Sequence, residues 1–314
     1  MRACGVCTWE QRVYAGVDQK FYPLLGGHET SGVVVEIGDG VVGHFELGDH
    51  VAVSTLFRCG RCHSCRRGLD NLCDCWALQE SPEGEALGPA GFGEYIRVPD
   101  HQVFRVAKTI SFQEAALSEP LACVIRSMKR ADVRPGDMVA IIGCGVMGLL
   151  HLFLARGRNA ITIVSEPDEA RAAKAEEFGA DFCIQPQRKD YVEQVMKLTL
   201  GCGVDKTFVA VSSAAVIHDA LKTTAKGGSV HLYSSIHPRG SEISLDPNLF
   251  HDREVTITGT VSQSSEDFLQ ATTMISSGNI DLKPLISAEY PLDQLKEALE
   301  AALSLSNYRV LVMM

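Results

Sequence analysis

Four cysteines of the chain have the spacing of a zinc site. Cys59, Cys62, Cys65 and Cys73 follow the pattern C-x2-C-x2-C-x7-C. Gaps of two residues allow neighbouring thiolates to converge on one ion, and four sulfurs around tetrahedral Zn²⁺ form a closed structural site. The spacing therefore predicts one structural zinc on these residues, in preference to a set of buried thiols.

The basic residues beside these cysteines suggest a second interpretation, a small nucleic-acid-binding zinc module. They are Arg58, Arg61, Arg66 and Arg67. The whole chain carries 39 acidic against 29 basic side chains, a formal net charge of -10, which disfavours nucleic acid or anionic lipid as a partner. We therefore expect a solvated basic face, with neither nucleic acid nor membrane bound to it.

A glycine-rich loop over residues 143–148 has the pattern G-x-G-x-x-G and lies between a predicted strand and a predicted helix. In this setting Gly143 allows a tight turn, Gly145 lets the backbone approach a pyrophosphate, and Gly148 lets helix and strand pack closely. Amides at the start of the helix then face the anion. We predict that a dinucleotide contacts Gly143, Gly145, Val146, Met147 and Gly148.

An acidic residue follows the next predicted strand, 160–164. Glu166 lies where a carboxylate can bind the ribose 2′-hydroxyl of a dinucleotide. A 2′-phosphate would be repelled there, since Asp168 and Glu169 add negative charge. The sequence thus predicts NAD as the cofactor, and we interpret Arg171 as an exposed helix residue.

Two kinds of structure are expected to position these residues. Between about residues 26 and 110, short strands alternate with glycine turns, which is typical of a barrel or sandwich. After about residue 114, apolar strands alternate with amphipathic helices, which indicates βαβ units and a parallel sheet. The predicted strands of the first part are 32–38, 50–54 and 94–98. Those of the second part are 138–142, 160–164, 181–184, 205–210 and 229–233, and its helices are 115–130, 146–156 and 168–178. A helix after about residue 262 and a strand at 308–312 break the alternation.

Length and composition agree with two globular domains. The 314 residues are 46% hydrophobic and 22% charged, and no run of about 18 apolar residues suggests a membrane span. The first residues lack the charged and apolar lead-in of a secretion signal, so we expect a cytoplasmic protein. In that compartment 11 cysteines indicate metal binding before disulfides.

Three short motifs far apart in the chain gain meaning beside the cysteine pattern and the glycine loop. They are Gly5-Val6-Cys7, Gly26-Gly27-His28-Glu29 and Ser118-Glu119-Pro120-Leu121. Two others are Gly48-Asp49-His50-Val51 and Gly91-Phe92-Gly93-Glu94-Tyr95. With these motifs in this order, the sequence resembles the zinc-dependent alcohol, polyol and threonine dehydrogenases of the medium-chain dehydrogenase/reductase superfamily, over essentially the whole chain.

The resemblance implies an α/β fold with two domains. A GroES-like, β-rich catalytic domain would comprise residues 1–120 and 262–314, and a Rossmann domain with a doubly wound parallel sheet would comprise residues 121–261. It further implies an enzyme that transfers a hydride between a secondary alcohol, such as a polyol or sugar derivative, and NAD. Family habit suggests a homo-oligomer, a dimer or tetramer.

By the same resemblance, Cys7, His28 and Glu119 hold a catalytic zinc, with Glu29 as a ligand in some members of the family. The chain would then bind two zinc ions. A Cys/His/Glu set that leaves one position open suits catalytic zinc, which as a Lewis acid lowers the pKa of a bound alcohol.

The sequence departs from the family near Cys7. The family usually has Ser or Thr two residues later as a proton relay, where this chain has Trp9, and Thr8 is the hydroxyl that would replace it. The usual aspartate nearby is Glu10, which we expect to orient a ligand. Family members carry about two or three short strands ahead of the ligand cysteine, so we expect this chain to lack the start of the catalytic domain. An alternative therefore stays open, a catalytically impaired relative that binds zinc and nucleotide.

Overall fold

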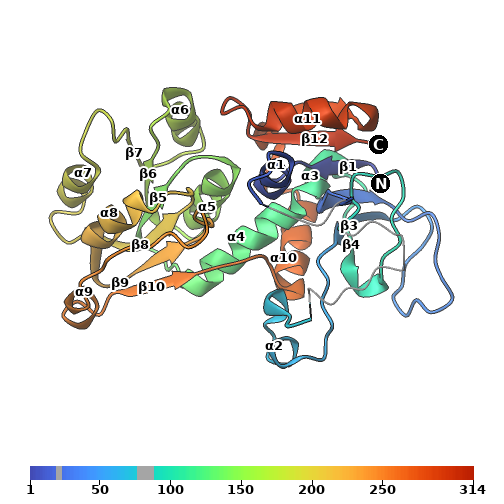
Figure 1. Ribbon diagram of the computed structural model, residues 1–314, viewed down its shortest axis with the longest axis horizontal. Helices are drawn as coiled ribbons and strands as arrows, with labels where there is room; N and C mark the ends of the chain where they lie inside the picture. Colours follow the sequence, from blue (N-terminus) through green and yellow to red (C-terminus); the bar gives the residue numbers. More distant parts are fainter. Residues whose placement is uncertain (19–22, 76–87) are drawn as a thin grey trace. The chain divides into compact units, whose positions relative to one another are not determined.

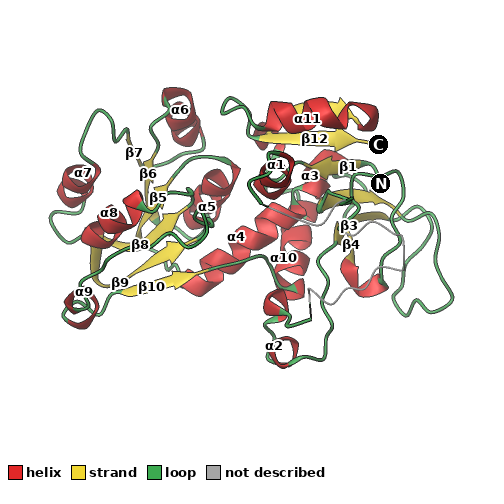
Figure 2. Cartoon of the chain, in the orientation of Figure 1, coloured by secondary structure: helices red, strands yellow, loops and turns green. Residues whose placement is uncertain are grey.

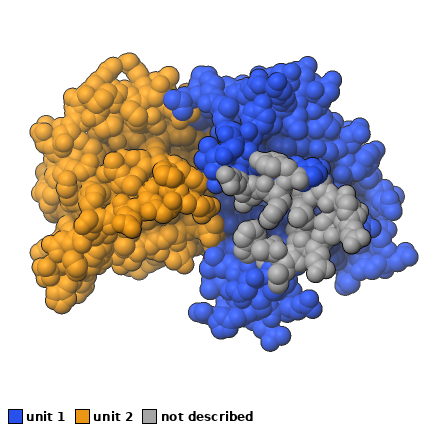
Figure 3. All heavy atoms as spheres, in the orientation of Figure 1, with its two compact units in different colours: residues 1–123, 262–314 blue, residues 124–261 orange. Residues whose placement is uncertain are grey.

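The computed structural model describes residues 1–18, 23–75 and 88–314, and these form two compact units (Figure 3). The first unit contains residues 1–123 and 262–314, and the second contains residues 124–261. In the described ranges, no helix is both long and apolar enough to cross a membrane.

A six-stranded mixed sheet forms the centre of the first unit, in the order β11-β12-β1-β2-β3-β4 (Figure 1). Its strands are β1 (Ala3–Gly5), β2 (Glu29–Val33), β3 (His50–Ser54), β4 (Val103–Arg105), β11 (Ile286–Pro291) and β12 (Arg309–Met313). Neighbouring strands are antiparallel, except that β11 and β12 are parallel. Because β1 lies between β12 and β2, residues from both ends of the chain meet in one sheet.

Helices pack beside this sheet or lie in the segments that connect its strands. They are α1 (Thr8–Tyr14), α2 (His63–Arg66), α3 (Phe112–Ala116), α10 (Ser265–Ser276) and α11 (Leu295–Ala302), with short 3-10 turns at Asp70–Leu72, Asp100–Gln102, Lys283–Leu285 and Leu292–Gln294. Helix α11 lies along β12 (Figure 1), where Ala298 and Ala302 share an apolar core with Val310 and Val312. Burial of this apolar surface holds the last strand in the sheet next to β1. Helix α4 (Ser118–Ala131) contains the boundary between the two units.

The second unit contains a six-stranded parallel sheet in the order β10-β9-β8-β5-β6-β7. Its strands are β5 (Met138–Ile142), β6 (Ile161–Ser165), β7 (Phe182–Ile184), β8 (Val204–Val209), β9 (Thr224–Leu232) and β10 (Thr256–Gly259). Its helices, α5 (Val146–Arg156), α6 (Glu169–Glu177), α7 (Tyr191–Leu198), α8 (Ala215–Thr223) and α9 (Asn248–His251), flank both faces (Figure 2). The strand order reverses at β5, and dinucleotides bind beyond the carboxyl ends of the strands at such a reversal.

The predicted alternation of strands and helices after residue 114 is confirmed. Strand β5 and helix α5 have the predicted bounds. The helix predicted at 115–130 is divided into α3 and α4, because Leu117 N bonds to Glu114 O three residues earlier and closes a tighter turn there.

Two strand predictions in the first unit are wrong in detail. Residues 94–98 form no strand, and Tyr95 among them is 75% exposed. The strand predicted at 32–38 is β2, whose pairing with β3 ends at Val33 opposite His50. Alternation and β-branched residues are local signals, whereas the length of a strand depends on the partners that continue beside it.

Candidate metal and cofactor sites

Cys7 lies at the junction between a strand and a helix. Strand β1 ends at Gly5 and helix α1 begins at Thr8, so Cys7 is the N-cap residue of the helix. Its backbone N–H donates a hydrogen bond to Glu10 Oε2 at 3.1 Å. Because this bond satisfies an end group of the helix, it fixes the backbone from which the Cys7 thiol projects.

The register of β1 and β2 brings His28 and Glu29 to Cys7. Gly5 lies opposite Glu29 in this antiparallel pair, so the residues just beyond the paired ends are neighbours. A Cβ at position 5 would lie 2.1 Å from Glu29 Oε2, and only glycine leaves room for the carboxylate. One ligand atom each from Cys7, His28 and Glu29 lies within 4.8 Å of the other two.

Glu10 joins the two segments that carry these residues. It is 4% exposed, and its Oε1 accepts hydrogen bonds from Gly27 N at 3.0 Å and from His28 Nδ1 at 2.7 Å. A carboxylate on Nδ1 sets the ring orientation and directs Nε2 to a metal. Burial lowers the pKa of His28, but the negative charges of Glu10 and Cys7 outweigh burial and raise that pKa well above its usual value.

Glu29 is a fully buried carboxylate in this group. Burial raises its pKa to about 7; Arg309, whose Nη2 lies 3.1 Å from Oε1, opposes that rise, and the charge of Glu119 adds to it. Neither oxygen of Glu29 accepts a hydrogen bond from the described residues. A buried carboxylate beside a thiol and an imidazole is a donor set that fits Zn²⁺.

Glu119 lies near this group without joining it. It is in the first turn of α4, 6% exposed, and its charge contributes to the raised pKa of Glu29. Its carboxylate is outside the 4.8 Å set found among the described residues, and its Oε1 accepts a hydrogen bond from Cys123 Sγ at 3.3 Å. The structure thus brings three of the four proposed ligands together and places the fourth within electrostatic range. Cys123 was not singled out from the sequence, and only its position one helical turn after Glu119 could have indicated it.

The two residues after Cys7 have different surroundings. Thr8 is exposed at the start of α1. Trp9 packs edge-on against His28, with ring centroids 5.7 Å apart and an interplanar angle of 76°. Trp9 therefore forms an apolar wall beside the histidine.

The four-cysteine lobe (residues 59–73) gathers its sulfurs around one point, all within 4.8 Å of one another. Backbone amides point at them: Cys62 N lies 3.2 Å from Cys59 Sγ, and Cys65 N lies 3.4 Å from Cys62 Sγ. Cys59 N lies 3.3 Å from Cys73 Sγ. Amides of Arg61 and Cys62 lower the pKa of Cys59 to about 6. Converging sulfurs with amide donors fit a closed four-thiolate zinc site, and all 11 cysteines of the chain are free of disulfides.

Arg58 does not belong to the solvated basic face expected beside this lobe. It is 8% exposed, its Nε lies 3.2 Å from Asp70 Oδ2, and its Nη2 donates to Gln263 O at 2.7 Å. The other three arginines are exposed as expected. The expectation is wrong for Arg58 because a carboxylate and a carbonyl oxygen compensate its guanidinium away from water.

The glycine loop of the second unit has the backbone that its pattern predicts. Gly143 follows β5 with φ of 100°, and Gly145 is the N-cap residue of α5. A Cβ on Gly148 would lie 1.9 Å from Gly143 O, so glycine allows the helix to pack on the loop. Val146 and Met147 form the first turn of α5, the end of a helix at which backbone amides can bind an anion.

Glu166 follows β6 as a buried, fixed acceptor beside this loop. Its Oε2 accepts a hydrogen bond from Cys144 N at 2.7 Å and its Oε1 accepts one from Asp168 N at 3.0 Å. Arg171, expected to be exposed, is partly buried, and its Nη1 lies 3.8 Å from where a Cβ on Gly145 would be. The helix pattern predicts which face Arg171 occupies but not that its long side chain folds back over the loop.

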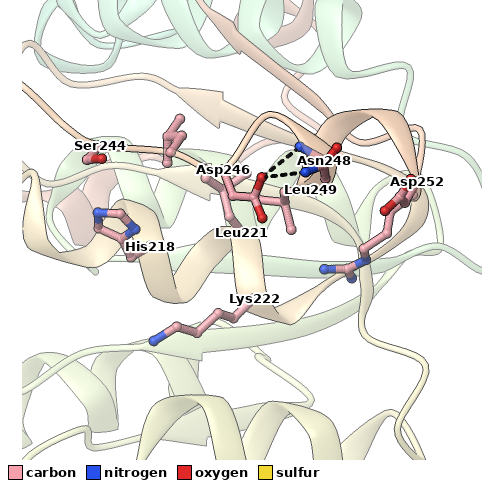
Figure 4. A pocket seen from close by; sticks show the side chains of 10 residues that line it. His218, Leu221, Lys222, Ser244, Asp246, Asn248, Leu249 and Asp252 are labelled. Atoms are coloured by element: carbon pink, nitrogen blue, oxygen red, sulfur yellow. Dashed lines mark hydrogen bonds between the residues drawn. The ribbon is translucent and has the colours of Figure 1, made fainter.

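A separate pocket of about 370 Å³ lies in the second unit (Figure 4). It is formed by α8, α9 and the segment before α9, and its charged side chains include Lys222 and Asp246. These are satisfied locally, since Lys222 pairs with Asp219 at 3.1 Å and Asp246 accepts hydrogen bonds from Asn248. None of the predicted site residues lines this pocket.

Comparisons with known proteins agree with this geometry. The Alcohol dehydrogenase GroES-like domain matches residues 1–108, and the Zinc-binding dehydrogenase domain matches residues 146–277. Sorbitol dehydrogenase of Bacillus subtilis (strain 168) is 30% identical over 316 residues, which cover 99% of this chain and 87% of that protein. L-threonine 3-dehydrogenase of Pyrococcus abyssi is 33% identical over 282 residues, which cover 88% of this chain and 78% of that protein.

A solved structure supports the same relationship. It is described as a zinc-binding dehydrogenase from Sinorhizobium meliloti 1021 bound to NADP, and it is 28% identical with a TM-score of 0.90. The alignment covers 100% of this chain and 90% of that one. The expected fold class, a GroES-like unit with a Rossmann unit, is confirmed. The chain belongs to the zinc-dependent medium-chain dehydrogenases, a family of nicotinamide-dependent oxidoreductases.

Proposed function

We propose that this protein oxidises a secondary alcohol, such as a polyol or a sugar derivative, with NAD as the hydride acceptor. The observation that carries the proposal is the convergence of Cys7, His28 and Glu29 in the first unit. The names of two relatives, sorbitol dehydrogenase and L-threonine 3-dehydrogenase, favour a polar substrate that bears a hydroxyl group. The alternative is a catalytically impaired relative that binds zinc and nucleotide, and turnover by zinc-loaded protein distinguishes it from an active enzyme.

The proposed metal ligands form two sets, one for a catalytic and one for a structural zinc. The catalytic set is Cys7, His28 and Glu119, with Glu29 as ligand or close neighbour, and the structural set is Cys59, Cys62, Cys65 and Cys73. Zinc bound by the catalytic set supplies Lewis acidity, which lowers the pKa of an alcohol hydroxyl.

The residues around the catalytic set orient it and limit access of water. An ionised carboxylate only accepts hydrogen bonds, so the contact with Glu10 places the ring proton of His28 on Nδ1. The lone pair of Nε2 is then available to bind a metal ion. Trp9 shields one side of the His28 ring. Thr8 is exposed next to Cys7, and we assign it the transfer of the alcohol proton to solvent.

The proposed preference for NAD depends on Glu166. Two backbone amides hold its carboxylate beside the glycine loop, so a 2′-phosphate would meet a fixed negative charge. Measuring kcat/KM with NAD and with NADP tests this preference. We expect a higher value with NAD, and Glu166→Ala should reduce the ratio by about five- to tenfold, since two unit charges about 4 Å apart in water interact by about 1 kcal/mol. Equal values in the wild type would contradict the assignment.

The remaining proposals concern organisation. We assign residues 1–120 and 262–314 to the catalytic domain and residues 121–261 to the dinucleotide-binding domain, in a dimer or tetramer of identical chains. Because free thiols persist in reducing compartments, the absence of disulfides among the cysteines favours a cytoplasmic location.

A substrate screen tests the proposed function as a whole. Zinc-loaded protein is incubated with NAD and a panel of alcohols, polyols and sugar derivatives, and NADH formation is followed. We expect turnover with at least one secondary alcohol and its loss after treatment with a zinc chelator. Absence of turnover in protein with both metal sites filled would contradict the proposal.

A further inference from the structure

The four-cysteine lobe holds the segment with which the chain re-enters the first unit. Asp70 Oδ2 accepts hydrogen bonds from Ser265 N at 3.0 Å and from Ser265 Oγ at 2.6 Å. Arg58 Nη2 donates to Gln263 O at 2.7 Å, and Arg58 pairs with Asp70 at 3.2 Å. Arg58 directly precedes the first lobe cysteine and Asp70 lies three residues before the last one, so folding of the lobe fixes both.

The side chain of Gln263 continues this connection inward. Gln263 is fully buried, and its Oε1 accepts hydrogen bonds from Ser262 Oγ at 2.8 Å and from Cys123 Sγ at 3.2 Å. Ser262 has φ of 56°, a conformation that residues other than glycine keep only where their surroundings hold them. Gln263 and Ser265, one and three residues after Ser262, are held by Arg58 and Asp70, and these contacts help to supply that constraint.

Cys123 stands between two acceptors. Its Sγ lies 3.2 Å from Gln263 Oε1 and 3.3 Å from Glu119 Oε1. Cys123 is buried, and a buried thiol is protonated near neutral pH because a thiol ordinarily titrates near about 8.5. A thiol has one proton, and a full hydrogen bond to one acceptor weakens the bond to the other.

We propose that Gln263 couples the four-cysteine lobe to the catalytic centre by competing with Glu119 for the hydrogen bond that Cys123 donates. When the lobe is folded around its metal, Arg58 holds Gln263 in place, Gln263 Oε1 accepts the hydrogen bond of the Cys123 thiol, and the Glu119 carboxylate is free to bind zinc. When that hold is lost, Cys123 donates to Glu119 and keeps it from the metal. The inference rests on the proposed function, since it takes Glu119 as a zinc ligand.

The first test removes the hydrogen bond that Arg58 donates to Gln263. Arg58→Met keeps the apolar stem of the side chain and removes its donors, and Arg67→Met is the matched control because Arg67 is exposed in the same lobe. Zinc affinity of the catalytic centre is measured on the full chain by competition with a chelator, and the site is also followed by the absorption spectrum of Co²⁺ bound there. We expect Arg58→Met to weaken this affinity by about tenfold, the low end for a hydrogen bond to a charged group, and to change the Co²⁺ spectrum. Arg67→Met should match the wild type.

Removal of the thiol distinguishes coupling from general damage. Cys123→Ala leaves no donor to hold Glu119, so adding it to Arg58→Met should restore catalytic-site affinity to within about threefold of the wild type. Cys123→Ser keeps a donor and should not restore it. If the effects of Arg58→Met and Cys123→Ala simply multiply, as for independent sites, the coupling is wrong.

If Arg58→Met does not fold, Asp70→Asn provides the same test with a milder change, and wild-type zinc affinity in that variant overturns the coupling.

Two outcomes separate this inference from the proposed function. If the wild type binds zinc at Cys7 but Arg58→Met binds it equally well, the coupling alone is overturned. If the wild type binds no zinc there, both the coupling and the proposed function are overturned.

Discussion

The two groups of metal-binding side chains are assembled in different ways. The lobe takes its four sulfurs from 15 consecutive residues, and backbone amides of the same segment support them. The catalytic group takes Cys7 from a helix cap and His28 and Glu29 from the start of another strand. A contiguous site depends on local spacing, whereas the second site depends on the register of β1 with β2. We therefore expect the first to tolerate distant changes and the second to be sensitive to its supporting residues.

The largest expected effect is loss of turnover at the assembled site. Cys7→Ser should lower kcat by about a thousandfold or more, because the Lewis acidity of zinc is worth several kcal/mol of transition-state stabilisation. The lobe should keep its zinc, since none of its ligands is changed. The measurements are kcat and zinc per chain. Full activity in this variant would show that Cys7 does not hold the catalytic zinc.

Disruption of the contiguous site should act mainly on stability. Cys62→Ala should remove one zinc per chain and lower the free energy of unfolding of the first unit by about 2–5 kcal/mol, the scale of losing a structural crosslink. Exposed Cys202 provides the control, and Cys202→Ala should change neither quantity. Metal analysis measures zinc per chain, and urea unfolding measures the free energy of unfolding. Unchanged zinc content in Cys62→Ala would exclude a four-thiolate site.

The second unit contains a buried histidine, His151, which makes stability depend on pH and belongs to neither metal-binding group. Burial lowers the pKa of His151 to about 4, while the imidazole of the unfolded chain protonates near pH 6.5. Stability from this residue is therefore complete above pH 6.5 and is lost as the pH falls toward 4, by about 3 kcal/mol in total. His151→Leu should make unfolding less dependent on pH in this window. An unchanged slope would argue against a buried neutral imidazole.

A smaller effect is expected from the carboxylate that supports the assembled site. Glu10→Gln retains the shape of the side chain but removes the charge that faces His28 Nδ1 and Cys7 N. The zinc affinity of the catalytic centre should fall by about 10–100-fold, while the affinity of the lobe stays the same. Chelator competition measures both affinities. An equal loss at both sites would indicate a general effect on the fold.

The same comparison explains how far the sequence could predict the molecule. Spacing alone indicated the convergence of Cys59 to Cys73, and strand–helix alternation indicated the second unit, because both signals are local. Cys7 and His28 could be named only by resemblance, since no pattern reveals that Gly5 lies opposite Glu29.

The features that were missed depend on contacts between distant segments. The inward turn of Arg58 requires Gln263, which lies 205 residues later. The bridging role of Glu10 requires His28, and the position of Cys123 between two acceptors requires α4 and Gln263 together. Hydrophobic period and residue type carry no information about such pairings.

The central claim is that one chain holds two zinc ions on two differently built sites, and zinc content is the most direct test. Wild-type protein is saturated with zinc, freed of loosely bound metal and analysed for zinc per chain by mass spectrometry. We expect two zinc ions per chain, one for each converging group. A fully active preparation with only one zinc per chain would contradict this account.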